Sequence, residues 1–426
     1  MDRKLRVTFS HATLVAIFLF LMKNCLYLVD TSLISVVGVI SYADIWLVLY
    51  VLYMFYIAFK YRNIRVGIPY FALEIIAVIV ICILSAFQAH RLFGQSIVLG
   101  IRPQRFFIVI MLSYFPMRKL LVAEKMDLEK LKKAIISFAL IEAVLSIIQQ
   151  FVYNYFVFMY CLTNVRYGSV RLYLSSSVIT LAMFFAMEGI INKKNFNKNV
   201  VMLIIGIIYM LTVIKGRLTT ISTISALLGG FILMKGISVR KIFYAAVVIV
   251  LILGFSRTQM FRDLTDTIEI ENGEIGGDTL DIRNEGRKHY FNRLDKNPYL
   301  GGGYPNELYA PAANAAGYYD EIMLNDNGIF GLMYVYGYVG IAIFAILFLR
   351  LLYLAWRIYK DNSIYSMIMY IIMVSVQAVN IAAWYWQNDG IFVLLLVMCM
   401  SEAIYLKREN AESEKNKKRI RIVWRR

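Results

Sequence analysis

The stretch that decides the fold runs from Asp281 to Gly340 and reads DIRNEGRKHYFNRLDKNPYLGGGYPNELYAPAANAAGYYDEIMLNDNGIFGLMYVYGYVG. It completes the one long polar segment of the chain, 256–327, and then continues directly into an apolar run. Apolar runs of helical length also precede the polar segment. The pattern predicts a hydrophilic loop held over a set of membrane helices.

The composition of the whole chain supports a membrane location. Of the 426 residues, 60% are hydrophobic and 17% are charged, whereas about a quarter of a soluble globular chain is charged. The four cysteines are scattered and the three histidines lack metal-ligand spacing, so neither a disulfide framework nor a metal site is expected. The net charge of +17 suits cytoplasmic loops and anionic lipid headgroups, so we expect no nucleic-acid partner.

The apolar runs predict an all-α, polytopic integral membrane protein. Because a span needs about 20 apolar residues, the chain can hold about twelve transmembrane helices. Their approximate positions are 9–29, 39–59, 67–87, 104–121, 134–153, 172–191, 200–215, 219–235, 242–256, 328–349, 364–384 and 389–406.

The distribution of Lys and Arg predicts the topology. With the N-terminus inside, every inner segment is basic, as short cytoplasmic loops usually are. Both termini are then cytoplasmic, and the long loop between helices nine and ten faces outward. The organisation expected is nine helices in 1–255, an extracytoplasmic loop in 256–327, three helices in 328–406 and a basic cytoplasmic tail in 407–426.

Arginine recurs on the predicted outer face, where positive charge is usually scarce. A guanidinium group binds phosphate through two parallel hydrogen bonds, so the cluster suits a lipid-linked phosphate or pyrophosphate. The alternative is that these side chains reach outer-leaflet headgroups. The residues concerned include Arg91, Arg102, Arg105, Arg166, Arg171, Arg217, Arg257, Arg262, Arg283, Arg287 and Arg293.

Two predicted spans carry carboxylates, Glu74 and Glu142. Because a charge is costly in hydrocarbon, we expect both to face the bundle interior, either bonding another helix or lining a proton or ion path. The sequence Leu227-Leu-Gly-Gly230 predicts a close-packing surface between helices.

Three motifs in order carry a resemblance to a known family. They are Val213-Ile-Lys-Gly-Arg217-Leu-Thr-Thr, Arg283 followed by Asn297-Pro-Tyr-Leu-Gly-Gly-Gly303, and Asp326-Asn327 followed by Gly337 and Gly340. The chain, mainly over 200–345, resembles the superfamily of O-antigen ligases and O-antigen or capsular polysaccharide polymerases (Wzy-type), which are membrane glycosyltransferases. Aspartate stands at 326 where the ligases have histidine, and this departure favours a polymerase.

The resemblance implies an enzyme that polymerises polyprenyl-pyrophosphate-linked oligosaccharide repeat units outside the bacterial cytoplasmic membrane, with the extracytoplasmic loop 256–327 as its catalytic loop. Arg217 and Arg283 would stabilise the departing pyrophosphate, and Asp326 would be the base, although Asp326 also suits a helix N-cap. A chain-length regulator and a flippase are expected partners, and no cofactor or metal is expected. Further substrate-binding candidates are Arg287, Arg102, Arg105, Arg166, Arg171, Gly301, Gly303, Tyr304 and Asn327.

Two of these expectations have alternatives. Gly301 and Gly303 either let the backbone approach a sugar or phosphate closely or form an ordinary flexible turn. The function itself has a near alternative, an O-antigen ligase that transfers glycan to lipid A core or protein. A rival from another class is a flippase for lipid-linked oligosaccharide, although transporters usually carry an internal repeat, and none is evident in this sequence.

Overall fold

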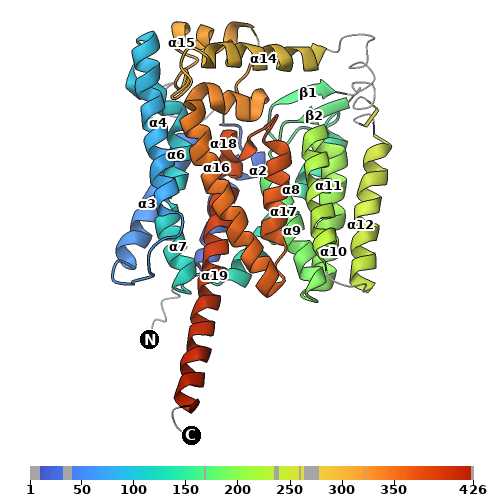
Figure 1. Ribbon diagram of the computed structural model, residues 1–426. Helices are drawn as coiled ribbons and strands as arrows, with labels where there is room; N and C mark the ends of the chain where they lie inside the picture. The colour runs from blue at the N-terminus through green and yellow to red at the C-terminus, as the bar shows by residue number, and fades with distance from the viewer. Residues whose placement is uncertain are drawn as a thin grey trace, which may run out of the picture.

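The computed structural model describes residues 10–31, 41–166, 169–234, 239–258, 261–262, 278–320 and 322–423. The fold is a bundle of helices with one small sheet (Figure 1). The elements are α1 His11–Met22, α2 Asn24–Tyr27, α3 Tyr42–Lys60, α4 Ala72–Phe93, α5 Ile97–Ile101, α6 Arg105–Leu112, α7 Tyr114–Val122, α8 Leu128–Val152, β1 Thr163–Arg166, β2 Ser169–Leu172, α9 Ser177–Ile191, α10 Phe196–Tyr209, α11 Arg217–Leu233, α12 Val239–Ser256, α14 Asp278–Leu294, α15 Ala310–Ala315, α16 Gly328–Asn362, α17 Ser366–Gln377, α18 Ala383–Trp386 and α19 Asn388–Val423.

Helices occupy all the segments in which the sequence predicts spans. Within the described residues, 7 of them are long and apolar enough to cross a membrane. These are Tyr42–Lys60, Ala72–Phe93, Ile97–Val122, Leu128–Val152, Phe196–Ile214, Asn325–Lys360 and Asn388–Glu409. The other apolar helices are shorter, and the arrangement is compatible with a multi-pass membrane protein.

The core of the bundle is formed around α9 and α19. Nearly every residue of α9 is buried, and so is 83% of the most apolar part of α19, within Asn388–Glu409. Helix α19 packs against α6, α7, α9 and α16. Its C-terminal part projects beyond the bundle at the end opposite α14 and α15 (Figure 1). The segment predicted as a basic tail is therefore helical as far as residue 423 and continuous with the last apolar helix.

Helix α16 is interrupted at Gly337, and the NPYLGGG motif fills the interruption. Gly337 has φ +64° and ψ −170°, which is not helical. The backbone N–H of Tyr338 donates to the Pro298 carbonyl at 2.8 Å, and the N–H of Gly302 donates to the Tyr334 carbonyl at 2.6 Å. The two motifs of the polar stretch are thus bonded to each other, which satisfies backbone groups that a broken membrane helix would otherwise leave unpaired.

Glycines 301 to 303 fit this contact because they have no Cβ atom. A Cβ at Gly301 would collide with the carbonyl oxygen of Tyr334, and one at Gly303 would collide with the backbone of Ala89 in α4. Gly301 and Gly303 also have φ values of +65° and +76°. The three glycines are buried, with Gly301 against the backbone of α16 and Gly303 against that of α4, so their close approach is to protein.

Ion pairs join helices in the interior. The expectation that Glu74 and Glu142 face the bundle is confirmed, since both are buried and bond to other elements, Glu74 to Arg350 and Glu142 to Lys23. Buried Arg118 donates to Glu402 at 2.6 Å. Such pairs satisfy charges that could not remain alone in an apolar interior.

Three local features complete the comparison with the sequence. The stretch Leu227–Gly230 is a close-packing surface as predicted, since a Cβ at Gly230 would meet Tyr244 of α12 and Met369 of α17. The prediction of an all-α fold missed one element, the antiparallel strand pair β1–β2, in which Thr163 pairs with Leu172. The segment 256–327, predicted as a loop, contains the helices α14 and α15.

Candidate functional site

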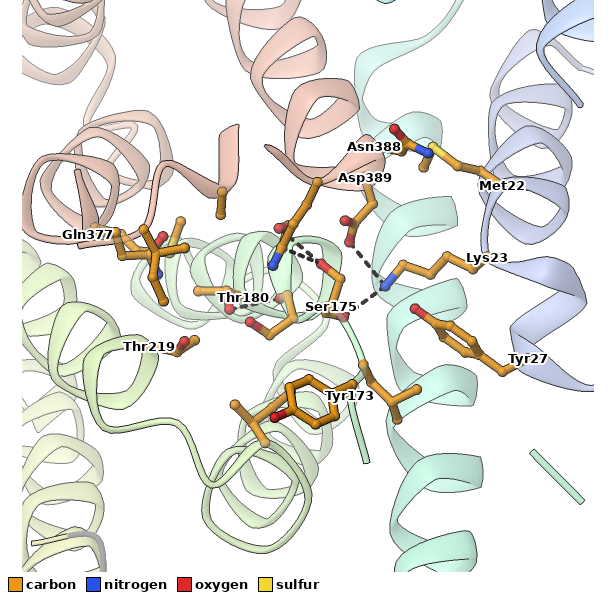
Figure 2. Close-up of a pocket in the computed structure, with 18 of the residues that line it drawn as sticks. Met22, Lys23, Tyr27, Tyr173, Ser175, Thr180, Thr219, Gln377, Asn388 and Asp389 are labelled. Atoms are coloured by element: carbon orange, nitrogen blue, oxygen red, sulfur yellow. Dashed lines mark hydrogen bonds and ion pairs between the residues drawn. The ribbon is translucent and has the colours of Figure 1, made fainter. Parts of the chain in front are cut away.

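A polar cavity of about 350 Å³ lies between α1, α9, α11, α17 and the start of α19 (Figure 2). Its lining comes from segments far apart in the sequence. Hydroxyl, amide and charged groups dominate it: Lys23, Arg171, Ser175, Thr180, Thr219, Gln377, Gln387 and Asp389. Such a lining offers hydrogen-bond donors and acceptors to a polar ligand rather than a surface for a lipid chain.

Lys23 lies at one side of the cavity between two carboxylates. Its Nζ atom is 2.6 Å from Glu142 Oε1 and 3.1 Å from Asp389 Oδ2, and it donates to the Ser175 carbonyl at 2.8 Å. Figure 2 shows Lys23, Asp389 and Ser175 converging. All three ionisable side chains are at most 5% exposed. One ammonium cannot neutralise two carboxylates, so the ionised cluster carries a net negative charge.

A left-handed turn directs Lys23 towards these partners. Asn24, Cys25, Leu26 and Tyr27 all have positive φ angles, from +51° to +60°. Each non-glycine residue in this region costs roughly 1–2 kcal/mol. The carbonyl of Tyr27 accepts a hydrogen bond from the N–H of Tyr160 at 2.6 Å. The chain therefore holds a strained turn at a cavity wall, as often occurs at functional sites.

Cationic side chains gather beside the cavity where β2 meets the connection between α10 and α11. Arg171, which lines the cavity, donates from Nε to the Ile214 carbonyl at 3.0 Å, and Lys215 donates to the Val170 carbonyl at 3.0 Å. Burial and the nearby Arg171 guanidinium lower the pKa of Lys215. Arg217 follows as the first residue of α11, so two predicted arginines and one lysine share this corner.

A second group of predicted residues gathers where α14 crosses the start of α16. Arg287 donates to Asn380 Oδ1 and stacks over the Phe330 ring at 5.2 Å. A Cβ at Gly286 would meet the side-chain amide of Asn327, so the helices touch here. Arg287 Nε and Asn327 Oδ1 are both buried, and neither has a hydrogen-bond partner among the described residues. Arg283 lies one turn before Arg287 on α14 and is partly buried.

Asp326 belongs to the same region but is exposed. The alternative role of Asp326 as a helix N-cap is wrong: α16 begins at Gly328, its N-cap is Asn327, and no side chain caps that end. The loop between α17 and α18 connects the two groups of residues. Asn380 in this loop bonds Arg287, and its neighbour Ile381 lines the cavity.

The other predicted residues are positioned differently. Arg105 is paired with Asp44 at 2.7 Å, and Arg102 is an exposed neighbour on the preceding turn. Arg166 ends strand β1, and its side chain lies outside the described part of the structure. Tyr304 is buried against Trp386, so its ring does not face a ligand-accessible surface. Gly301 and Gly303 pack against protein backbone, and this packing explains why both positions are glycine. The structure therefore does not support the expectation that they contact substrate.

Sequence reasoning missed Lys23 and Asp389 as site residues. Both are charged residues at the edges of apolar runs, and this position was the available signal, because intramembrane charges often mark functional sites. No group of three or more potential metal-ligating side chains occurs among the described residues. The arrangement can bind an anionic group at its cationic corner and a hydroxylated group within the cavity.

Comparison with known proteins adds no relative. No family model, no curated protein and no solved structure matched this chain.

Proposed function

We propose that this protein is a bacterial membrane glycosyltransferase that polymerises polyprenyl-pyrophosphate-linked oligosaccharide repeat units into surface polysaccharide. It would act on the outer face of the cytoplasmic membrane, with about twelve spans and both termini in the cytoplasm. A flippase would supply the repeat units, and a chain-length regulator would act with it. The proposal rests on the three motifs quoted above and on the chemistry of the cavity.

The observation that carries the proposal is the pairing of a cationic corner with a hydroxyl- and amide-lined cavity. Arg171, Lys215 and Arg217 suit a diphosphate, because guanidinium and ammonium groups form charge-assisted hydrogen bonds with phosphate oxygens. Ser175, Gln377 and Gln387 suit sugar hydroxyl groups, which both donate and accept hydrogen bonds. A lipid-linked oligosaccharide contains both chemical groups.

In the proposed reaction, an acceptor hydroxyl attacks the anomeric carbon of the donor glycan. The bond from that carbon to the pyrophosphate oxygen breaks, and Arg217 and Arg283 stabilise the charge that develops on the departing pyrophosphate. The hydroxyl proton passes to a carboxylate. Asp326 is the candidate that the motif suggests for this step, and Arg287 and Asn327 are further candidates for binding the substrate.

The test is electrophoresis of surface polysaccharide from a strain that lacks the gene, complemented with wild type, Arg283→Ala or the exposed control Arg62→Ala. We expect single repeat units without the gene, a full ladder with wild type or Arg62→Ala, and no ladder with Arg283→Ala. Normal polymer length with Arg283→Ala contradicts the proposed role. Full-length polymer that stays on its lipid carrier indicates a ligase, and the absence of lipid-linked units outside the membrane indicates a flippase.

A further inference from the structure

In the buried ion cluster, Asp389 and Glu142 each have one carboxylate oxygen, Oδ2 and Oε2, without a hydrogen bond among the described residues. Lys23 makes hydrogen bonds of good geometry to Glu142 Oε1 at 2.6 Å and to the Ser175 carbonyl at 2.8 Å. Asp389 Oδ2 lies 3.1 Å from Lys23 Nζ, but it has no hydrogen bond among the described residues. Because a buried carboxylate oxygen without a hydrogen bond is costly, its retention suggests that a ligand completes it.

The position of Asp389 separates it from Glu142. Asp389 lines the cavity, whereas Glu142 is fully buried behind Lys23 and is not part of the lining. Asp389 is also the second residue of α19, where the partial positive charge of a helix N-terminus favours the ionised carboxylate. An ionised carboxylate in a ligand-accessible cavity is in the state needed to accept a proton.

The groups around Asp389 suit a sugar. Ser175 Oγ donates to Gln387 Oε1 at 2.9 Å, and Gln377 donates to Ser222 at 2.9 Å, so the amide and hydroxyl groups of the cavity are oriented by protein bonds. The amide hydrogens of Gln387 and the hydroxyl of Thr219 can serve a ligand. A ligand hydroxyl that donates to Asp389 Oδ2 would give this oxygen the hydrogen bond that the described residues do not supply.

We propose that the cavity binds the acceptor sugar and that Asp389, rather than Asp326, accepts the proton of the attacking hydroxyl. This inference rests on the proposed function. As the oxygen of the hydroxyl bonds to the anomeric carbon, its proton moves to Asp389 Oδ2, and the bonding pair between that carbon and the pyrophosphate leaves with the lipid carrier. Lys23 positions Asp389 and stays protonated between the two carboxylates. Asp326 is exposed and does not line the cavity.

The experiment uses the full chain in proteoliposomes and lipid-linked repeat units purified from the strain that lacks the gene. Asp389→Asn, Asp326→Asn and the control Glu74→Gln are compared with wild type for kcat and KM. Glu74 is a matched control because its buried carboxylate lies outside the cavity lining and its partner Arg350 is 34% exposed, so Glu74→Gln leaves no fully buried charge unpaired. Asp389→Asn leaves Lys23 paired with Glu142, so no buried charge loses its only partner.

We expect Asp389→Asn to lower kcat by at least about 100-fold with KM within about threefold of wild type, as for loss of a general base. The control Glu74→Gln should keep kcat within about threefold of wild type, and Asp326→Asn should lower kcat at least about tenfold less than Asp389→Asn does. A kcat for Asp389→Asn within about threefold of wild type overturns the inference, as does a comparable loss in Asp326→Asn. Wild type that fails to polymerise the units contradicts the proposed function instead.

A second pair of variants keeps the test decisive where Asp389→Asn does not fold. Asp389→Glu and Asp389→Gln introduce side chains of nearly the same size, and only the glutamate can accept a proton. We expect measurable turnover with Asp389→Glu and none with Asp389→Gln. Equal turnover in the two folded variants assigns Asp389 a packing role and overturns the inference.

Discussion

Lys23 Nζ lies 2.6 Å from Glu142 Oε1, although the two residues are 119 positions apart in the chain. The pair joins the end of α1 to the middle of α8, and both side chains are almost fully buried. The backbone immediately after Lys23 has a left-handed conformation. A strained turn and a buried charge therefore occur at the same wall of the cavity. The fold tolerates the backbone strain at the place where it holds the Lys23 ammonium.

Lys23→Met should destabilise the protein by about 3–5 kcal/mol, because it leaves Glu142 and Asp389 buried without their cation. The measurement is the midpoint of thermal unfolding in detergent. Lys194→Met removes the exposed ion pair with Glu129, in which the side chains are 58% and 50% exposed, and should leave the midpoint unchanged. Equal midpoints for the two variants would contradict the role given to the buried cluster.

Gly301→Ala should prevent the docking of the NPYLGGG motif on α16, because the new Cβ collides with the Tyr334 carbonyl. Gly67→Ala is a close control, since Gly67 has a similar φ of +64° and an added Cβ there would meet no atom within 4 Å. Gly67→Ala should lower the free energy of unfolding only by the conformational cost of about 1–2 kcal/mol. The check is the yield of folded, monodisperse protein, which should fall much further for Gly301→Ala.

Arg217→Lys should lower polymerisation by about tenfold or more, although the positive charge is kept. Lysine cannot reproduce the two parallel hydrogen bonds of a guanidinium group, and a hydrogen bond to a charged group contributes about 1.5–3 kcal/mol. Polymer yield in the complemented strain is the measurement. The same substitution at exposed Arg62 should have no effect, and full activity of Arg217→Lys would show that only net charge is needed.

Arg287→Ala should loosen α14 from the loop between α17 and α18, because it removes the bond to Asn380 and the contact with Phe330. Limited proteolysis of the purified protein should then cut within α14 faster than in wild type. Its exposed neighbour Lys288 gives the control, and Lys288→Ala should leave the cleavage rate near that of wild type. Identical cleavage of both variants would contradict an anchoring role for Arg287.

Much of the secondary structure could be predicted from the sequence, because apolar runs of helical length are a local signal. The close packing at Leu227–Gly230 and the inward position of Glu142 follow from similarly local rules. The partner of Glu142 could not be predicted. Which of the Lys and Arg side chains reaches a buried carboxylate depends on how helices distant in sequence are arranged.

The candidate site was predictable only in part. The outer arginines were visible as a set, and two of them, Arg171 and Arg217, do share one corner of the structure. The cavity beside them is built from five separate segments, so its other polar residues carry no common motif. Gly301 and Gly303 do form a visible motif, but the sequence does not say what the motif is for. A glycine motif can mark a close approach to ligand or to protein, and here the neighbour is protein.

The bonds between the NPYLGGG motif and the break in α16 also bear on how such a protein can be altered. The polar stretch is not a module that could be transplanted onto another set of membrane helices, because its glycines match the backbone of Ala89 and Tyr334. A chimera that exchanges this stretch must exchange the facing turns of α4 and α16 as well. Changes in specificity are more accessible in the cavity wall, where side chains rather than main-chain contacts meet the ligand space.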